Sequence, residues 1–540
     1  MQKKGKLVDI FNKKIYNAQI TIENGKIAKI EELPEAPELY ILPGFIDSHV
    51  HIESSMLVPS RFSQLSVMHG TVACVCDPHE IANVMGIDGV NFMIHNSKLV
   101  PQKFFFGAPS CVPATDFETS GSRIDVEQID KLLQNDDIYF LAEMMNYPGV
   151  IFDEKEVANK IQLSQKYAKP IDGHAPLLKG EHLKKYVEAG ISTDHECTNI
   201  DEAFEKIALG MKILIRSGSA AKDFEKLFSL IDQYPNQVMF CTDDCHPDDL
   251  VDHHINDMVK KSIAKGANLF NVLQAACLNP VVHYNLPVGL LRVGDKADFI
   301  VVDNIQNFNL QEMFIDGKCV FENSKINFNI PEYKSFPNNF VAKKINDFDL
   351  QLKAITNKAR VIVAQDHSLL TNMEIKDIKV QNDFVQNDTE NDILKILVLN
   401  RYKEAEPVVA LIKGFELKKG AIATSVAHDS HNIIAVGTSD KEIATAINEV
   451  IKYKGGMCVV SDNQTSVLPL PVAGLMSADE PQKVANTYQK LNLKAKELGC
   501  RLSAPFMTLS FMALLVIPSL KISDKGLFDA DKFQFTKLFI

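Results

Sequence analysis

The feature that most constrains the fold is an alternation of short apolar runs with helical patterns between residues 41 and 284. This alternation is typical of βα units, whose parallel strands are buried beneath the helices that connect them. Eight such runs fit a closed (β/α)8 barrel, so we expect an α/β fold of that kind. The predicted strands are 42–50, 70–76, 104–109, 138–144, 170–174, 190–195, 211–216 and 237–243, and the clearest predicted helices are 154–168, 200–209, 248–265 and 268–279.

The segments on both sides of this region predict a second, smaller unit. Residues 7–32 alternate apolar and polar side chains around a Glu23-Asn24-Gly25 turn, which is typical of a hairpin. A similar pattern returns at 290–302 and 313–320. We therefore predict a small β domain built from residues 1–40 and 285–335, with the barrel of residues 41–284 inserted between its halves.

The last third of the chain predicts a separate domain. A chain of 540 residues is too long for one core. Residues 336–340 and the Asn-rich, charged stretch beyond them have the composition of a linker. Residues 345–540 then mix apolar strands with helical patterns, so we expect an additional C-terminal α/β or α+β domain. Its clearest predicted elements are strands 393–399 and 433–436 and helices 440–454 and 480–499.

Composition and charge exclude several kinds of partner. The chain is 46% hydrophobic and 23% charged, as ordinary globular proteins are, and its formal charge of -12 provides no basic stripe for nucleic acid. The start of the chain has no apolar signal-peptide region, and residues 506–520 predict a core element, so we expect no membrane partner. The ten cysteines contain no C-x-x-C pair, which favours reduced thiols and a cytoplasmic protein.

Polar residues at the ends of the predicted strands indicate a metal site. His49 and His51 end the first strand, and because side chains alternate along a strand, both imidazoles lie on the same side. In a barrel of this kind, catalytic groups collect at the carboxyl ends of the strands. Four imidazoles and two carboxylates at one mouth can hold two divalent cations, with one carboxylate bridging them. These residues are His49, His51, Glu143, His174, His195 and Asp243.

Longer motifs around these residues resemble a known family. The run Pro43-Gly-Phe-Ile-Asp-Ser-His-Val-His51, with later strand-end histidines and Thr242-Asp243, resembles the amidohydrolase superfamily. More narrowly, several segments are similar to the bacterial, metal-dependent adenine deaminase family, and the resemblance extends into the C-terminal domain. These segments are His51–Met56, Cys76-Asp-Pro-His-Glu-Ile-Ala-Asn-Val-Met-Gly86, Leu141–Val150, Cys241–Asp244 and Gly420–His431.

The resemblance implies a ligand set and cofactors. His49 and His51, with Asp243, would bind the first metal, and His174 and His195 would bind the second. Glu143 would bridge the two ions, at a position where many relatives carry a carboxylated lysine. The resemblance suggests Mn²⁺ first, with Fe²⁺ or Zn²⁺ as the other candidates, because mixed imidazole and carboxylate ligands suit all three ions.

The implied reaction is hydrolytic deamination of adenine to hypoxanthine and ammonia, a step of purine salvage or catabolism. We expect Asp243 to take the proton of the attacking water and pass it to the leaving amine. Glu80 or His79, at the end of the second predicted strand, is the candidate acid for the ring nitrogen N1. The alternative is that this Asp-Pro-His-Glu segment is only a helix N-terminus, with Glu80 in its first turn.

Further residues are candidates for the substrate pocket. Glu53, Ser54 and Ser55 follow the histidine pair, although a plain loop explains them equally well, and Ser219 lies in the segment Arg216–Ala221. That segment departs from the family pattern, since some relatives are expected to carry an acidic residue in place of Ser217. Cys74 and Cys76 are predicted core residues. His428, Asp429 and His431 form a cluster for which a turn or a subunit contact is the first interpretation.

Two other interpretations stay open. A dihydroorotase-like or hydantoinase-like enzyme acting on a cyclic amide would use the same metal ligands, and a scaffold protein would have lost some of them. Deaminases of the cytidine type carry H-x-E with P-C-x-x-C, and the sequence lacks that pair. A small-molecule substrate and a homo-oligomer are the expected partners.

Overall fold

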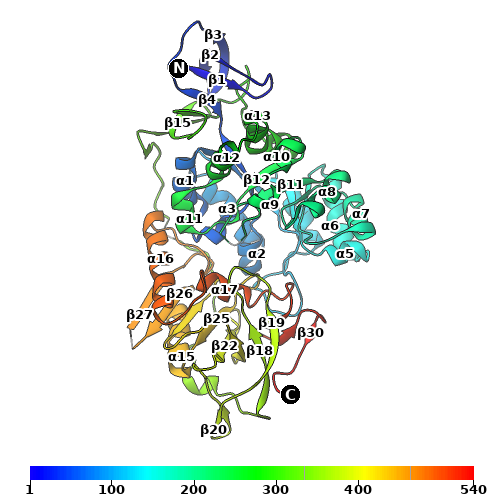
Figure 1. Cartoon of the computed structure of the whole chain (residues 1–540), viewed down its shortest axis with the longest axis vertical. Helices are drawn as coiled ribbons and strands as arrows, with labels where there is room; N and C mark the ends of the chain where they lie inside the picture. The colour runs from blue at the N-terminus through cyan, green and yellow to red at the C-terminus, as the bar shows by residue number, and fades with distance from the viewer. Residues whose placement is uncertain (220, 334, 463) are drawn as a thin grey trace. The chain divides into compact units, whose positions relative to one another are not determined.

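The computed structural model describes residues 1–219, 221–333, 335–462 and 464–540, and the chain forms two compact units (Figure 1). The barrel unit comprises Met1–His79, Asn91–Cys111 and Asp125–Glu332. The C-terminal unit comprises Glu80–Val90, Val112–Ile124 and Tyr333–Ile540. Each unit has its own apolar core. The domain boundaries expected from the sequence stay a prediction, and they do not anticipate the two short segments that join the C-terminal unit.

The flanks of the barrel unit form one eight-stranded sheet in the order β17-β16-β15-β14-β4-β1-β2-β3. Its hairpin between β2 and β3 turns at Asn24 and Gly25, which both have positive φ, as a tight turn requires. β4 pairs in parallel with β1 and antiparallel with β14, and so joins the two halves of the sheet. The strands are β1 Gln2–Asp9, β2 Lys14–Glu23, β3 Lys26–Glu32, β4 Tyr40–Pro43, β14 Phe299–Val302, β15 Leu310–Ile315, β16 Lys318–Glu322 and β17 Lys325–Ile326.

The predicted barrel is confirmed, with strands in the predicted places. Parallel strands run in the order β13-β5-β6-β7-β8-β9 and β10-β11-β12. β13 follows β12 directly in the chain, and a parallel bridge between Ile171 and Ile191 connects β9 with the approach to β10. The strands are β5 Phe45–His51, β6 Thr71–Cys76, β7 Lys103–Ala108, β8 Ile138–Met144, β9 Ile171–Gly173, β10 Thr193–Asp194, β11 Lys212–Arg216, β12 Val238–Cys241 and β13 Asp243–Asp244.

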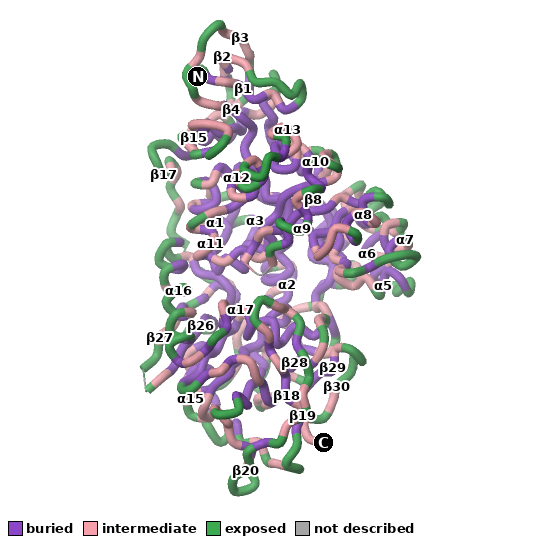
Figure 2. Tube along the Cα trace, viewed as in Figure 1, coloured by how far each residue is buried: buried purple, intermediate pink, exposed green. Residues whose placement is uncertain are grey.

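The strands of this barrel are mostly buried, because helices pack against them. Every residue of β6, including Cys74 and Cys76, is buried, and Figure 2 shows the interior of the unit as buried. The helices along this part of the chain are α1 Pro59–Ser66, α2 His79–Met85, α3 Ile87–Ser97, α4 Val126–Leu133, α5 Tyr147–Ile151, α6 Lys155–Lys166, α7 Gly180–Glu188, α8 Ile200–Ala208, α9 Phe224–Leu227, α10 Leu230–Gln233, α11 Pro247–Asp252, α12 Ile255–Ala264, α13 Leu269–Leu273 and α14 Asn279–Tyr284.

Two predicted helices are interrupted. The predicted helix 248–265 divides into α11 and α12 at His253 and His254, and His254 is buried with its ring bonded to Thr71 and next to Asp47. The predicted helix 268–279 becomes α13, a π-helical turn and α14. Pro280 lies in the first turn of α14, where its missing N–H costs no helical bond.

The C-terminal unit is built on an eight-stranded, mostly antiparallel sheet in the order β19-β18-β23-β22-β25-β24-β26-β27. Helix α15 buries Ile443, Ile447 and Val450, spaced by one helical turn, against this sheet. The elements are β18 Lys358–Val363, β19 Asn372–Asp377, β20 Val380–Gln381, β21 Phe384–Val385, β22 Leu394–Leu399, β23 Val408–Lys413, β24 Ala421–Thr424, β25 Ile433–Gly437, α15 Asp440–Lys452, β26 Gly456–Ser461, β27 Gln464–Pro469, α16 Pro481–Glu497, α17 Pro505–Phe511, β28 Leu520–Ser523, β29 Gly526–Asp529 and β30 Gln534–Phe535.

The apolar stretch 506–520 lies mostly in α17 and the turns that follow it, and α17 is buried except at Met507. Within the described part of the chain, no helix combines the length and the apolar character that a membrane crossing requires.

Buried Lys521 predicts an unusual pH dependence for this unit. Its ammonium donates to the carbonyl oxygens of Leu369 and Phe511 at 2.9 Å, and burial lowers the pKa of Lys521 from 10.5 to about 7. The folded state therefore binds fewer protons than the unfolded chain between pH 7 and 10.5, so Lys521 makes the unfolding free energy rise with pH there. Each pKa unit is worth about 1.4 kcal/mol, so the expected rise is a few kcal/mol.

Denaturant titrations at pH 7 to 10 check this expectation. Relative to wild type, Lys521→Met should flatten the pH dependence of the unfolding free energy. Exposed Lys532 is the matched control, and Lys532→Met should leave the dependence unchanged. An identical pH slope in wild type and Lys521→Met would show that Lys521 is charged when folded.

Candidate metal centre and active site

Six predicted ligands meet at the carboxyl ends of the barrel strands. They come from five different strands or strand ends, yet their ligand atoms form overlapping groups within 4.8 Å. All are buried except His174, which is partly exposed. The residues are His49 and His51 on β5, Glu143 on β8, His174 after β9, His195 after β10 and Asp243 on β13.

Glu143 lies between the two histidine pairs. Its Oε1 is 3.5 Å from Nε2 of His51, and its Oε2 is 2.9 Å from Nδ1 of His174 and 3.1 Å from Nε2 of His195. Oε1 therefore faces His51 and, at 3.3 Å, Nδ1 of His79, whereas Oε2 faces His174 and His195. This is the arrangement that a carboxylate bridging two cations requires.

Asp243 completes the first half of the cluster. Its Oδ1 is 3.1 Å from Nε2 of His51 and 3.6 Å from Nε2 of His49. Its backbone has φ 59, a strained conformation for a non-glycine residue, which is common where function needs a particular side-chain direction. The neighbouring loop approaches so closely that a Cβ on Gly218 would lie 1.9 Å from the carbonyl oxygen of Thr242.

Asp47 fixes the two strand ends to each other. Its Oδ1 accepts the N–H of Thr242 at 3.0 Å, and its Oδ2 accepts the Thr242 hydroxyl at 2.5 Å. Asp47 lies two residues before His49 and Thr242 lies directly before Asp243. The bonds therefore set the spacing between ligands that are nearly two hundred positions apart in sequence.

The electrostatics of the cluster favour a cation. Burial alone would raise the pKa of Glu143, but the neighbouring His174 and His195 hold it well below its usual range. Burial opposes protonation of His174, yet Glu143 and Glu196 raise its pKa to about 9, and the pKa of His195 is raised in the same way. Ionised carboxylates buried at this density need positive partners. The donor set of imidazole and carboxylate is that of a divalent metal site.

Arg216, at the end of β11, also contacts the cluster, although the sequence analysis did not include it among the candidate ligands. Its Nη1 donates to Oδ2 of Asp243 at 2.8 Å and also contacts Glu196, and its Nη2 donates to Asp223 at 3.1 Å. Burial would raise the pKa of Asp243, but hydrogen bonds from His49 and His51 and the nearby guanidinium hold it well below its usual range. Arg216 therefore keeps one oxygen of Asp243 turned away from the histidines.

The two candidate acids lie in different surroundings. Nδ1 of His79 is 3.3 Å from Oε1 of Glu143 and 3.3 Å from Oδ2 of Asp77, and the His79 ring meets that of His51 edge to face. His79 therefore contacts the metal cluster itself. Glu80 instead bonds to histidines of the C-terminal unit. Neither the His79 contact nor Asp77 follows from sequence spacing alone.

The candidate substrate residues are buried or partly buried, and the three serines among them donate hydrogen bonds within the protein. The hydroxyl of Ser54 donates to Asp244 at 2.5 Å, that of Ser55 to the carbonyl of Ile52 at 2.6 Å, and that of Ser219 to Asp249 at 2.5 Å. Glu53 is buried in the same 3₁₀ turn, Ile52–Ser55. These hydroxyls hold the loops of the mouth together, and Ala220 beside Ser219 lies outside the described residues.

Buried Lys206 ties the loops that carry the second histidine pair. Its ammonium contacts Asp194 at 2.7 Å, Glu202 at 2.8 Å and the carbonyl oxygen of Ala175 at 2.7 Å. Asp194 also accepts the N–H of Ala175 at 2.9 Å. Burial would raise the pKa of Asp194, but Lys206 lowers it to about 2. His174 and His195 are each next in sequence to a member of this network.

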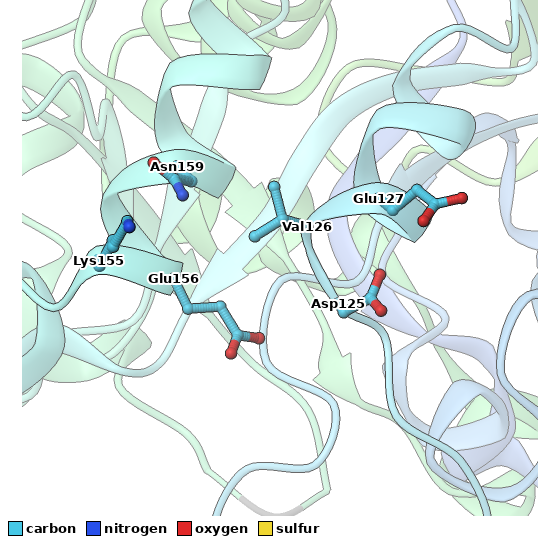
Figure 3. Close-up of a pocket in the computed structure, with 6 residues that line it drawn as sticks. All are labelled: Asp125, Val126, Glu127, Lys155, Glu156 and Asn159. Atoms are coloured by element: carbon cyan, nitrogen blue, oxygen red, sulfur yellow. The ribbon is translucent and has the colours of Figure 1, made fainter.

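A pocket of about 450 Å³ on the surface is separate from these residues (Figure 3). It lies between the starts of α4 and α6 and contains none of the predicted site residues. Its lining is Asp125, Val126, Glu127, Lys155, Glu156 and Asn159.

Comparisons with known proteins agree with the fold and the cluster. The model of the amidohydrolase family matches residues 40–320, and the model of the adenine deaminase C-terminal domain matches residues 368–534. The barrel and its buried cluster are those of an amidohydrolase. A β-aspartyl dipeptidase structure from Fervidobacterium islandicum AW-1 shares 17% identity and a TM-score of 0.46, covering 61% of this chain and 100% of that one.

Whole-chain relatives give the narrower assignment. Adenine deaminase of Methanosarcina mazei is 51% identical over 549 residues, covering 99% of both chains, and that of Parabacteroides distasonis is 50% identical over 538 residues, covering 99% and 98%. Adenine deaminase of Sulfurovum sp. is 52% identical over 538 residues, covering 99% of both. The chain belongs to the adenine deaminase family.

Proposed function

We propose that the chain hydrolyses adenine to hypoxanthine and ammonia. The observation that carries the proposal is Glu143, whose two oxygens face different histidine pairs in a buried cluster of a chain of this family. His49, His51 and Asp243 would hold one divalent ion and His174 and His195 a second, with Glu143 between them. Mn²⁺ is the expected ion, with Fe²⁺ and Zn²⁺ as the other candidates.

Bound divalent cations acidify water, so hydroxide is available at neutral pH. Asp243 takes up the remaining proton of the water as oxygen adds to C6 of adenine, and hands it to the amino group, which leaves as ammonia when the C6–N bond breaks. The ring nitrogen N1 gains a proton from Glu80 or His79 during the addition. The acid recovers its proton from water, so one water is consumed and N1–H stays in the product.

Arg216 and His79 have supporting roles in this proposal. Arg216 binds Oδ2 of Asp243 at 2.8 Å and so directs Oδ1 toward His49 and His51. His79 contacts Glu143, which favours Glu80 over His79 as the acid at N1. Glu53, Ser54, Ser55 and Ser219 stay predicted substrate residues.

The cellular setting is also inferred. All ten cysteines are free thiols, which supports a reducing, cytoplasmic compartment. Adenine as substrate supports a place in purine salvage or catabolism. A homo-oligomer stays a prediction from the sequence.

Metal-stripped protein reconstituted with Mn²⁺, Fe²⁺ or Zn²⁺ tests the proposal. We expect ammonia release from adenine at about two bound ions per chain, and none from the stripped protein. Dihydroorotate and hydantoin test the cyclic-amide alternative, since their hydrolysis opens the ring without ammonia. Ring opening of either compound, with adenine left unchanged, would contradict the proposal.

A further inference from the structure

A second histidine cluster lies within the C-terminal unit, around Glu80. This unit contains Glu80–Val90 as well as the loop between β24 and β25. Nδ1 of His428 is 2.5 Å from Oε1 of Glu80, and Nε2 of His431 bonds to Oε2 of the same carboxylate. All three side chains are buried, with exposed fractions of 2% for Glu80, 8% for His428 and 1% for His431. Both oxygens of Glu80 are therefore held at once.

His431 is a donor whose direction is fixed by the backbone. The N–H of Ala427 donates to Nδ1 of His431 at 3.3 Å, so the ring proton lies on Nε2, the atom that bonds to Glu80. The N–H of His431 in turn bonds to the carbonyl oxygen of Ala427 at 2.7 Å, and His431 has φ 53. Burial lowers the pKa of His431 to about 4, so the ring is a neutral donor at physiological pH.

His428 is fixed by a different contact. Its ring stacks on Phe511, at the end of α17, with centroids 4.7 Å apart and planes inclined by 10°. Phe511 is itself buried. The two histidines thus reach Glu80 from opposite ends of one short turn, 428–431, and each ring is immobilised by something other than Glu80.

We propose that His428 and His431 are positioning residues that hold the carboxylate of Glu80 in one orientation for proton exchange with the purine ring. The inference rests on the proposed function, and Glu80 is next in the chain to His79, which contacts Glu143. A glutamate side chain that can rotate loses rotamer entropy when it is fixed. Two N–H donors that are already in place fix the carboxylate before substrate binds, so this entropy is not lost again on binding.

The inference gives the C-terminal unit a chemical role. If the pair only anchored helix α2, replacing the donors would change stability, and the loss of activity would not depend on Glu80. If the pair positions Glu80, removing a histidine donor should cause no further loss of activity once the carboxylate has been replaced. A double-mutant cycle separates these cases.

The experiment uses the full-length protein loaded with Mn²⁺ and compares donor-removing with donor-preserving variants. His428→Leu and His431→Leu remove the N–H, whereas His428→Asn and His431→Gln place an amide N–H near Nδ1 and Nε2. We expect kcat for adenine to fall about 10- to 100-fold in the leucine variants, with KM within about threefold and metal content unchanged. The amide variants should have a higher kcat than the leucine variants. On a logarithmic scale, they should recover at least about a third of the fall in kcat that leucine causes.

The cycle with Glu80→Gln decides the inference. His431→Leu combined with Glu80→Gln should lose no more activity than Glu80→Gln alone. Losses that multiply, or leucine variants with wild-type kcat, would overturn it. Where a leucine variant does not fold, His428→Ala or His431→Ala, which also removes the donor, takes its place in the cycle.

Two controls keep the failures distinguishable. His367, an exposed histidine of the same unit with a side chain 80% exposed, is the matched control, and His367→Leu should retain full activity. A wild-type protein that releases no ammonia from adenine would end the proposed function. An active wild type whose leucine variants stay active would end the positioning role alone.

Discussion

Glu143→Gln is expected to cost the protein most of its bound metal. Its two carboxylate oxygens face different histidines, since Oε1 is 3.5 Å from His51 and Oε2 is 2.9 and 3.1 Å from His174 and His195. An amide keeps one carbonyl oxygen, but it turns the other contact into an N–H donor and removes a full negative charge. Metal analysis after dialysis should show fewer than two ions per chain, and adenine turnover should fall at least about 10³-fold.

Glu196→Gln is the matched control for this loss. Glu196 is a carboxylate near the same His174, with Oε1 at 3.9 Å, but its closest partner is Arg216. Removing its charge should leave the metal content near that of wild type. Glu143→Gln protein that keeps two ions per chain would refute the bridging role, and equal metal loss in both variants would mean that total charge, and not bridging geometry, controls binding.

The barrel and the positions of its candidate ligands could be predicted from the sequence because both follow short-range rules. Parallel strands that are buried on both faces appear in the sequence as apolar runs. The side chains at their carboxyl ends must lie together at one end of the barrel. His49, Glu143 and Asp243 were therefore predictable in position before any coordinates, although nearly two hundred residues separate the first from the last. The lengths of the strands were less predictable, since the predicted strand 190–195 contains only β10, Thr193–Asp194.

What the sequence could not predict depends on directions of side chains and on which segments pack together. Arg216 also ends a strand, but only its geometry shows that it binds Asp243 at 2.8 Å. Glu80–Val90 joins the C-terminal unit because Glu80 pairs with histidines about 350 positions later, and no local pattern encodes such a pair. The cluster at His428 and His431, first interpreted as a turn or a subunit contact, is a turn whose rings bind Glu80.

Asp243→Asn is expected to abolish turnover while leaving metal content largely intact. The amide is isosteric, so its oxygen can still face His49 and His51, whose Nε2 atoms lie 3.6 and 3.1 Å from Oδ1. It cannot accept and return a proton, because an amide has no basic oxygen of comparable strength. Loss of a general acid–base group costs about 10² to 10⁴ in rate, and loss of the group that serves both addition and departure belongs at the upper end.

The neighbouring carboxylate provides the control. Asp244 follows Asp243 directly and accepts the hydroxyl of Ser54 at 2.5 Å, so Asp244→Asn removes an equal charge one residue away. It should keep activity within about tenfold of wild type, since an amide oxygen still accepts from Ser54. Ammonia release and metal content measured on both variants distinguish the roles. Near-normal turnover in Asp243→Asn would exclude the proton transfer, whereas loss of metal together with activity would mean that Asp243 acts chiefly as a ligand.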